Sequence, residues 1–85
     1  MDISAAFQQA VADSKELSDR PSNDTLLQLY SLFKQATEGN AGEDDPSNPF
    51  DFVAKAKFAA WTALRDKPKE AAMQEYIQLV NKLKS

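Results

Sequence analysis

The chain has 85 residues, 42% of them hydrophobic, and carries 10 basic against 13 acidic side chains, a formal net charge of −3. This length supports one domain around one core, and the lack of cysteine and histidine excludes disulfides, thiolate metal sites and the usual histidine-based catalytic groups. General nucleic-acid binding would need a basic excess. Where the lysines fall therefore matters more than their total.

The first periodic segment predicts a helix over residues 3–15. Its apolar residues recur three and four positions apart, which places them on one helical face: Ile3, Ala6, Phe7, Ala10 and Val11. Pro21 ends this region, because proline lacks a backbone N–H and cannot continue a helix. Residues 18–20 are therefore interpreted as the connection to the next helix.

A second helix is predicted over residues 22–38. Ser22 can accept hydrogen bonds from the exposed backbone N–H groups of the first turn, and Asp24 suits the positive end of the helix dipole. Gly39 can adopt the left-handed conformation that commonly closes a helix. A broad apolar stripe follows the helical period at Leu26, Leu29, Tyr30 and Phe33.

Residues 40–49 are interpreted as a solvated loop. They contain the acidic run 43–45 and two prolines, Pro46 and Pro49. Acidic residues in a loop suggest calcium, but the alternating oxygen ligands, central glycine and closing glutamate of an EF-hand loop are missing. So long a loop also allows the two helices beside it to be something other than antiparallel neighbours.

Two further helices are predicted over residues 51–65 and 68–84. The apolar stripe of the first comprises Val53, Ala56, Ala60 and Leu64. Pro68 and Glu70 are typical of the first turn of a helix. The stripe of that last helix comprises Met73, Tyr76, Ile77, Val80 and Leu83. No useful stretch alternates with a period of two, so the sequence predicts an all-α fold with four helices.

Catalysis has little support in the residues. The chain offers neither histidine nor cysteine, and its two glycines cannot form a glycine-rich phosphate loop. A small acidic acyl-carrier-like protein is a second possibility, but it would need a modifiable serine in an Asp-Ser-Leu motif at the start of its second helix. Here Asp13-Ser14 is followed by Lys15 and lies late in the first helix, so that match is poor.

A binding module is the third possibility, and it rests on rings and ammonium groups from three predicted helices. Tyr30 and Lys34 are four residues apart and share one helical face, while Lys57 and Tyr76 belong to the third and fourth helices. If these faces meet around one cleft, the lysines can bind a phosphate and a tyrosine can stack on a base. The same residues also fit a helical protein-interaction module with ordinary surface lysines, and periodicity does not decide between the two.

Three motifs carry a resemblance that covers nearly the whole chain. They are YSLFKQATEG at 30–39, KAKFAAW at 55–61 and AMQEYI at 72–77. With these motifs the chain resembles the acyl-CoA-binding protein family, known also as the diazepam-binding inhibitor family. The resemblance implies an up-down-down-up four-helix bundle that forms one acyl-CoA-binding domain over residues 1–85. It also implies reversible lipid binding, in which long-chain fatty acyl-CoA is transported and held as a pool for fatty acid metabolism.

The resemblance further implies which residues contact the ligand. Tyr30, Lys34 and Lys57 would hold the 3′-phosphate of the adenosine part of CoA, and Tyr76 would contact the nucleotide. Other family ligand positions are matched by Lys15, Ser31, Leu32 and Phe33. The wall of the acyl-chain groove would include Phe7, Ala10, Leu27 and Phe33. The chain departs from the family at Val53, Ala54 and Phe58, where lysine, glycine and tryptophan are usual, which removes one cation near the phosphates.

The remaining expectations concern partners and location. Fatty acyl-CoA is the expected ligand and partner, with no cofactor, no metal and no nucleic acid, and the protein is expected not to be an enzyme. Neither a secretory signal nor an apolar run of about eighteen residues is visible. We therefore expect a cytoplasmic monomer without stable membrane insertion.

Overall fold

The computed structural model describes residues 3–42 and 50–84 of the chain. These residues contain no strand and form four helices: α1 (Ile3–Ser14), α2 (Asn23–Glu38), α3 (Phe52–Thr62) and α4 (Lys69–Lys84). The predicted all-α fold is confirmed, and the bounds of α1, α2 and α4 agree with the predicted ones to within one residue at each end. The acidic run 43–45, interpreted as a solvated loop, lies outside the described residues.

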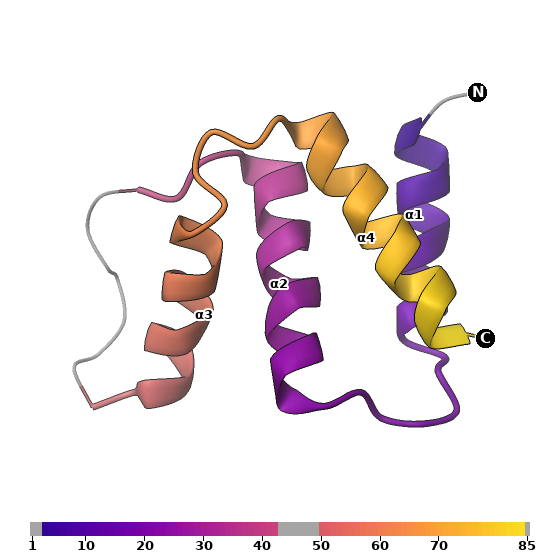
Figure 1. The fold of residues 1–85 in the computed structure, drawn as a ribbon, viewed down its shortest axis with the longest axis horizontal. Coiled ribbons are helices and arrows are strands. Elements are labelled where there is room, and N and C mark those ends of the chain that lie inside the picture. The colour runs from indigo at the N-terminus through magenta and orange to yellow at the C-terminus, as the bar shows by residue number, and fades with distance from the viewer. Residues whose placement is uncertain (1–2, 43–49, 85) are drawn as a thin grey trace.

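The helices lie beside one another in the order α3, α2, α4 and α1 (Figure 1). α1 and α4 run in one direction and α2 and α3 in the other, which is the up-down-down-up arrangement expected from the resemblance. As a result α2 and α3 are parallel neighbours. Residues four apart on one of these helices can therefore face residues four apart on the other.

The third helix is shorter than predicted. It ends at Thr62, and beyond it the Leu64 N–H donates to the Trp61 carbonyl over 2.9 Å and the Arg65 N–H to the Thr62 carbonyl over 3.0 Å. These bonds span three residues, so the chain tightens into turns instead of continuing the α-helix. Asp66 then takes a φ of 72°, a conformation that non-glycine residues seldom adopt. Hydrophobic period alone cannot separate such turns from a last helical turn.

The core lies between α1, α2 and α4. Its buried members come from these three helices: Phe7, Ala10, Leu29, Leu32, Ala36, Ala72, Tyr76 and Val80. By contrast, α3 contributes no buried residue, and Val53 at the start of its predicted apolar stripe is 65% exposed. Of the other described helices, α3 packs against α2 only. The predicted stripe is therefore only partly covered, and α3 is left with apolar surface beside α2.

A polar network ties the end of α2 to the turn before α4. Gln35 is fully buried, and its Nε2 donates to the Lys67 carbonyl over 2.8 Å and to Asn40 Oδ1 over 2.9 Å. Asn40 Oδ1 also accepts from the Asp66 N–H at 2.8 Å. Asn40 Oδ1 thus accepts from a side chain near the end of α2 and from the backbone of the turn after α3. The network holds the turn between α3 and α4 against the end of α2.

Replacing Asn40 with alanine is expected to destabilise the protein by about 1–2 kcal/mol, because two donors lose their acceptor and one of them is buried. For a domain of this size that loss corresponds to a fall in melting temperature of roughly 4–8 °C per kcal/mol. Thermal and urea unfolding would measure it. Asn81→Ala, which changes an exposed residue within α4, is the matched control and should be neutral or slightly stabilising. Equal unfolding of the two variants would contradict the role of the network.

Asp13 links α1 to the end of α4. Its carboxylate accepts from Gln9 Nε2 over 2.9 Å and from Lys84 Nζ over 3.1 Å. The hydrogen bond from Gln9 and then that from Lys84 lower the pKa of Asp13 below its ordinary value. A carboxyl whose folded pKa is lowered stabilises the fold at pH values above its unfolded pKa of about 3.9 and loses this effect as the pH falls through the folded value.

Asp13→Asn is therefore expected to melt at a lower temperature than the parent protein at pH 7, with the difference disappearing as the pH falls below about 4. Calorimetric melting between pH 7 and pH 2.5 would follow this convergence. Asp19→Asn removes an exposed carboxylate from the loop after α1 and serves as the control. A gap for Asp13→Asn that stays constant over the whole range would contradict the assignment.

Candidate ligand-binding site

Two lysines and two aromatic rings meet where α2 and α3 face each other. The Nζ of Lys57 on α3 lies 5.3 Å from the centre of the Tyr30 ring on α2, and the Nζ of Lys34 on α2 lies 5.0 Å from the centre of the Trp61 ring on α3. Both distances fall within the range of cation–π attraction. Each helix supplies one ring and one lysine four residues apart, so the parallel orientation lets each lysine meet the ring opposite. We call these four residues the lysine–ring seam.

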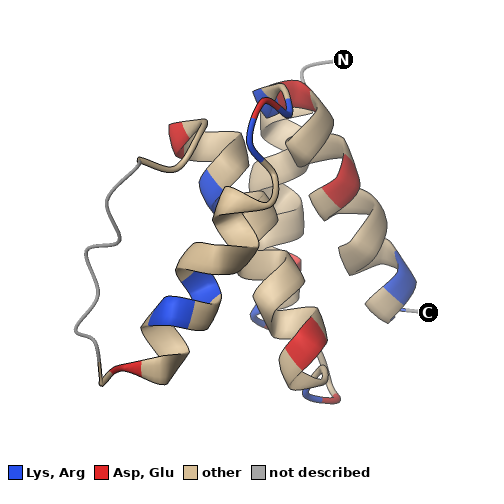
Figure 2. Cartoon of the chain, turned by 60° about the vertical axis from the view of Figure 1, so that its left-hand side comes forward, with Lys and Arg blue, Asp and Glu red and all other residues tan. Residues whose placement is uncertain are grey.

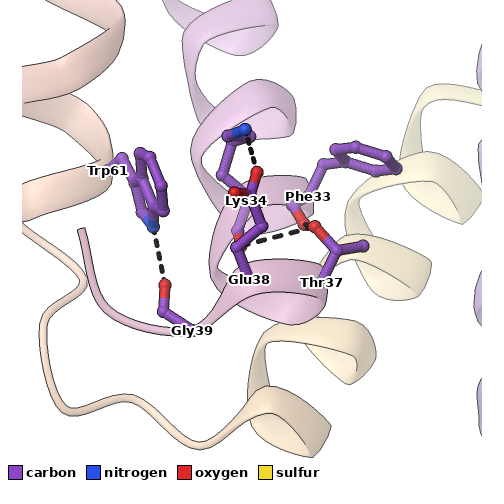
Figure 3. Close-up of polar contacts among 6 residues, drawn as sticks. All are labelled: Phe33, Lys34, Thr37, Glu38, Gly39 and Trp61. Atoms are coloured by element: carbon purple, nitrogen blue, oxygen red, sulfur yellow. Dashed lines mark hydrogen bonds and ion pairs between the residues drawn. The ribbon is translucent and has the colours of Figure 1, made fainter. Parts of the chain in front are cut away.

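The Trp61 ring of the seam is held from two sides. Its Nε1–H donates to the Gly39 carbonyl over 2.8 Å (Figure 3), and the Phe58 ring meets it edge-on at 6.4 Å. Gly39 follows α2 with a φ of 82°, and its N–H donates to the Gln35 carbonyl. Gly39 thus ends the helix with the positive φ expected of it. The residue that closes α2 also positions the ring beside Lys34.

The charge of α3 adds to this seam. Between Phe52 and Thr62 the helix carries Lys55 and Lys57 and no acidic residue (Figure 2). In a chain with a net charge of −3, this makes α3 a locally basic element. The position of the lysines and not their total number makes an anion site possible here.

An apolar groove of about 660 Å³ adjoins the seam between α2 and α3. Tyr30 and Lys57 line it at the seam, and Arg20 brings a further cation from the loop before α2. The rest of its wall is largely apolar and comprises Asn23, Leu26, Leu27, Phe52, Val53 and Ala56. Part of this wall is the apolar surface that α3 leaves uncovered. A cationic end and an apolar body are thus combined in one groove.

A second hollow of about 310 Å³ opens on the other side of Tyr30, between α1, α2 and α4. Lys15 lies on its wall with the rings of Tyr30, Phe33 and Tyr76. It shares Tyr30 and Leu26 with the apolar groove, so the two spaces meet at these side chains. A flat ring with a nearby anionic group would find aromatic faces and an ammonium group in this hollow.

The Tyr76 side chain is buried but contributes to that hollow. It is 4% exposed, its ring meets Phe7 edge-on at 5.2 Å, and its hydroxyl donates to Ser14 Oγ over 3.1 Å. Ser14 Oγ in turn donates to the Val11 carbonyl over 2.7 Å. The Ser14 hydroxyl is therefore engaged on both sides, which does not favour its use as a modification site in an acyl-carrier-like protein.

The structure brings only some of the predicted site residues together. Tyr30, Lys34 and Lys57 share the seam, whereas Ser31 and Leu32 are buried on α2. The Ser31 hydroxyl donates to the carbonyl one turn earlier, that of Gln28, over 3.0 Å. Neither Ser31 nor Leu32 lines the groove or the second hollow.

Only some of the residues predicted to form the acyl-chain wall lie side by side. Leu27 lines the apolar groove beside α3. Phe7 lines a third hollow, of about 480 Å³, together with Phe33 near α1 and α4. Ala10 is buried in the core. Phe7 and Phe33 thus lie together, with ring centres 6.0 Å apart, whereas Leu27 lines a different space.

Six of the nine residues that line the groove were not predicted to contact the ligand: Arg20, Asn23, Leu26, Phe52, Val53 and Ala56. Leu26 lies four residues before Tyr30 on α2 and so shares its face, a signal that was available in the spacing. Arg20 lies in the connection before Pro21, where no periodicity indicates a direction. Its position depends on the path of the loop between α1 and α2.

Residues 3–42 and 50–84 contain neither a candidate metal site nor a candidate membrane span. No group of three or more histidine, cysteine, aspartate and glutamate side chains lies close enough there to hold a metal ion. Among the four helices, none is long and apolar enough to cross a bilayer. The protein is thus a small all-α protein in which the lysine–ring seam adjoins an apolar groove.

Comparison with known proteins identifies the family. The family model described as acyl CoA binding protein matches residues 4–80, so the chain belongs to the acyl-CoA-binding protein family. It is 45% identical to an acyl-CoA-binding protein homolog of Drosophila melanogaster, with 95% of this chain and 93% of that protein covered. The crystal structure of acyl-CoA-binding protein 2 of Oryza sativa superposes with a TM-score of 0.89 at 36% identity, over 96% of this chain and 90% of that one. The family resemblance and the four-helix fold are confirmed.

Other relatives are much longer than this chain. The enoyl-CoA delta isomerase 2 of Rattus norvegicus is 48% identical over 79 residues, which cover 93% of this chain but 20% of that protein. The chain therefore spans about a fifth of that relative. The similarity shows a shared region of the acyl-CoA-binding type and carries no isomerase activity over to this chain.

Proposed function

We propose that this protein binds long-chain fatty acyl-CoA reversibly and acts as a carrier and pool former for these esters. Membership of the acyl-CoA-binding protein family supports the ligand class. The observation that carries the proposal is the lysine–ring seam at the end of the 660 Å³ apolar groove. Acyl-CoA has a multiply anionic head and an apolar tail, and it needs cations and an apolar surface within one ligand length.

In this proposal the seam and the second hollow hold the head of the ligand. Lys57 and Lys34 would bind the 3′-phosphate, and the Tyr30 hydroxyl would donate to it. Charge-assisted contacts of this kind contribute about 1.5–3 kcal/mol each. The adenine would lie against the rings of Phe33 and Tyr76, with Lys15 at the rim of the hollow.

The apolar groove would hold the tail. Leu26, Leu27 and Ala56 line it, and Val53 supplies further apolar surface where the family often has a lysine. Each methylene removed from water contributes about 0.8 kcal/mol. Affinity should therefore rise with acyl length until the groove is filled.

The finer expectations belong to the same proposal. A reversible carrier needs no general base, and we expect no chemical turnover of the bound thioester. We also expect a monomer that resides in the cytoplasm, without nucleic-acid partners or stable membrane insertion. The protein-interaction and acyl-carrier alternatives are not favoured, because neither accounts for the family match over residues 4–80.

Calorimetric titration with palmitoyl-CoA, free palmitate and free CoA tests the proposal. We expect palmitoyl-CoA to bind far more tightly than either part, since only the ester fills both the seam and the groove. Equal affinity for palmitate and palmitoyl-CoA would refute the assignment of the head group. Absence of binding by all three ligands would refute the proposed function as a whole.

A further inference from the structure

Lys34 already has an anionic partner in the structure. Its Nζ forms an ion pair with the Glu38 carboxylate one turn later on α2 (Figure 3). The Lys34 side chain is 24% exposed and that of Glu38 is 54% exposed. The Glu38 carboxylate is therefore paired with the same ammonium group that, in the proposed function, binds the phosphate of the ligand.

Helix stability does not explain this acid. Glu38 is the last residue of α2, where the negative end of the helix dipole disfavours a negative charge. The pair also has the less favourable order, since a glutamate is better placed four residues before a lysine than four residues after it. The dipole therefore favours a neutral residue at this position, and an ion pair in this order offsets that effect only weakly. Glu38 therefore contributes little to the stability of α2 itself.

The surroundings of Lys34 suggest how the pair can open. The Trp61 ring lies 5.0 Å from Lys34 Nζ and is held in place by its hydrogen bond to the Gly39 carbonyl. Glu38 is more than half exposed, so its carboxylate can turn into solvent without disturbing the core. The lysine can then remain against the ring while the carboxylate is exchanged for another anion.

We infer that Glu38 is a built-in competitor of the ligand phosphate at Lys34. In the empty protein the carboxylate neutralises the ammonium group, and an incoming phosphate must displace it. This competition lowers the affinity for the nucleotide head and favours release, which suits a carrier that must deliver its ligand. The inference rests on the proposed function and adds a residue that limits binding to those that support it.

The test uses soluble head-group fragments, so that no tail contributes to the result. Adenosine 3′,5′-bisphosphate carries the 3′-phosphate, and adenosine 5′-monophosphate lacks it. Glu38→Gln keeps the shape of the side chain and removes its charge, and is expected to tighten binding of the bisphosphate by about two- to fivefold, the range of an exposed ion pair. Binding of the monophosphate should change little. Glu75→Gln on α4, which breaks the ion pair with Lys67 of the preceding turn, is the matched control and should alter neither.

A double-mutant cycle separates competition at Lys34 from a general change of charge. In a Lys34→Met background, which keeps the apolar stem of the lysine, Glu38→Gln should no longer improve bisphosphate binding. Unchanged or weaker binding by Glu38→Gln alone would overturn the inference, and so would an equal gain in the Lys34→Met background. Palmitoyl-CoA binding by the parent protein is measured in parallel. If the parent protein binds palmitoyl-CoA, either overturning outcome refutes the competitor role of Glu38 and leaves the proposed function intact. If the parent protein does not bind palmitoyl-CoA, both the competitor role and the proposed function are refuted.

Discussion

Lys57→Ala is expected to weaken the binding of palmitoyl-CoA by about ten- to a hundredfold, because one charge-assisted contact to phosphate contributes about 1.5–3 kcal/mol. The side chain lies over Tyr30 at the point where the apolar groove meets the second hollow. Among the described lysines of α3, Lys57 is the one that both lies against the Tyr30 ring and lines the apolar groove. Calorimetry would measure the change, and circular dichroism should show the helical content unaltered.

The matched control is Lys55→Ala, two residues earlier on the same helix. It removes the same charge from the same basic element, but residues two apart point in different directions on a helix. The Lys55 variant should retain most of the affinity. If the two variants lose affinity equally, long-range charge and not a local phosphate contact determines binding, and the assignment of the seam is wrong.

Ala56→Trp is expected to abolish most of the advantage of a long acyl chain. Ala56 lines the apolar groove, and an indole ring there would take up space that the tail needs. If four methylenes lose their place, binding weakens by about 3 kcal/mol, or roughly a hundredfold, at about 0.8 kcal/mol for each methylene. Palmitoyl-CoA should therefore lose affinity strongly, while octanoyl-CoA should change little.

Ala59→Trp provides the control for this substitution. Ala59 is exposed on α3 about one turn further on and does not line the groove. The same bulky ring at that position should leave the preference for long chains intact. A fall for both acyl lengths in Ala56→Trp would instead indicate that the head group is displaced. Unchanged binding of palmitoyl-CoA would place the tail elsewhere, for example in the hollow lined by Phe7 and Phe33.

The local structure could be predicted from the sequence because its signals act over a few residues. Ser22 caps α2 by accepting from the Thr25 N–H over 3.2 Å, and Gly39 ends the helix with a positive φ. Both features depend on side-chain chemistry and conformational freedom at single positions. The four helices and most of their ends could therefore be predicted from the sequence. The family was indicated separately by the motifs at 30–39, 55–61 and 72–77.

Local signals do not determine how a residue is placed relative to other helices, and three cases show this. Val53 belongs to a helical stripe, yet it is exposed because, among the described helices, α3 packs against α2 alone. Ser31 and Leu32 neighbour the site in sequence but are buried. Arg20 reaches the groove from a loop whose direction no period describes. Periodicity gives the face of a residue relative to its own helix and not the neighbour which that face will meet.

Tyr30 and Lys34 show how the two levels divide. Their spacing of four residues put a ring and an ammonium group on one side of α2, and this follows from helix geometry alone. Only the tertiary structure decided that α3 runs parallel to α2, so that Lys57 meets the Tyr30 ring and Lys34 meets Trp61. The cause is physical: short-range backbone preferences set each helix, whereas the pairing across helices depends on how the shared apolar surfaces are buried together.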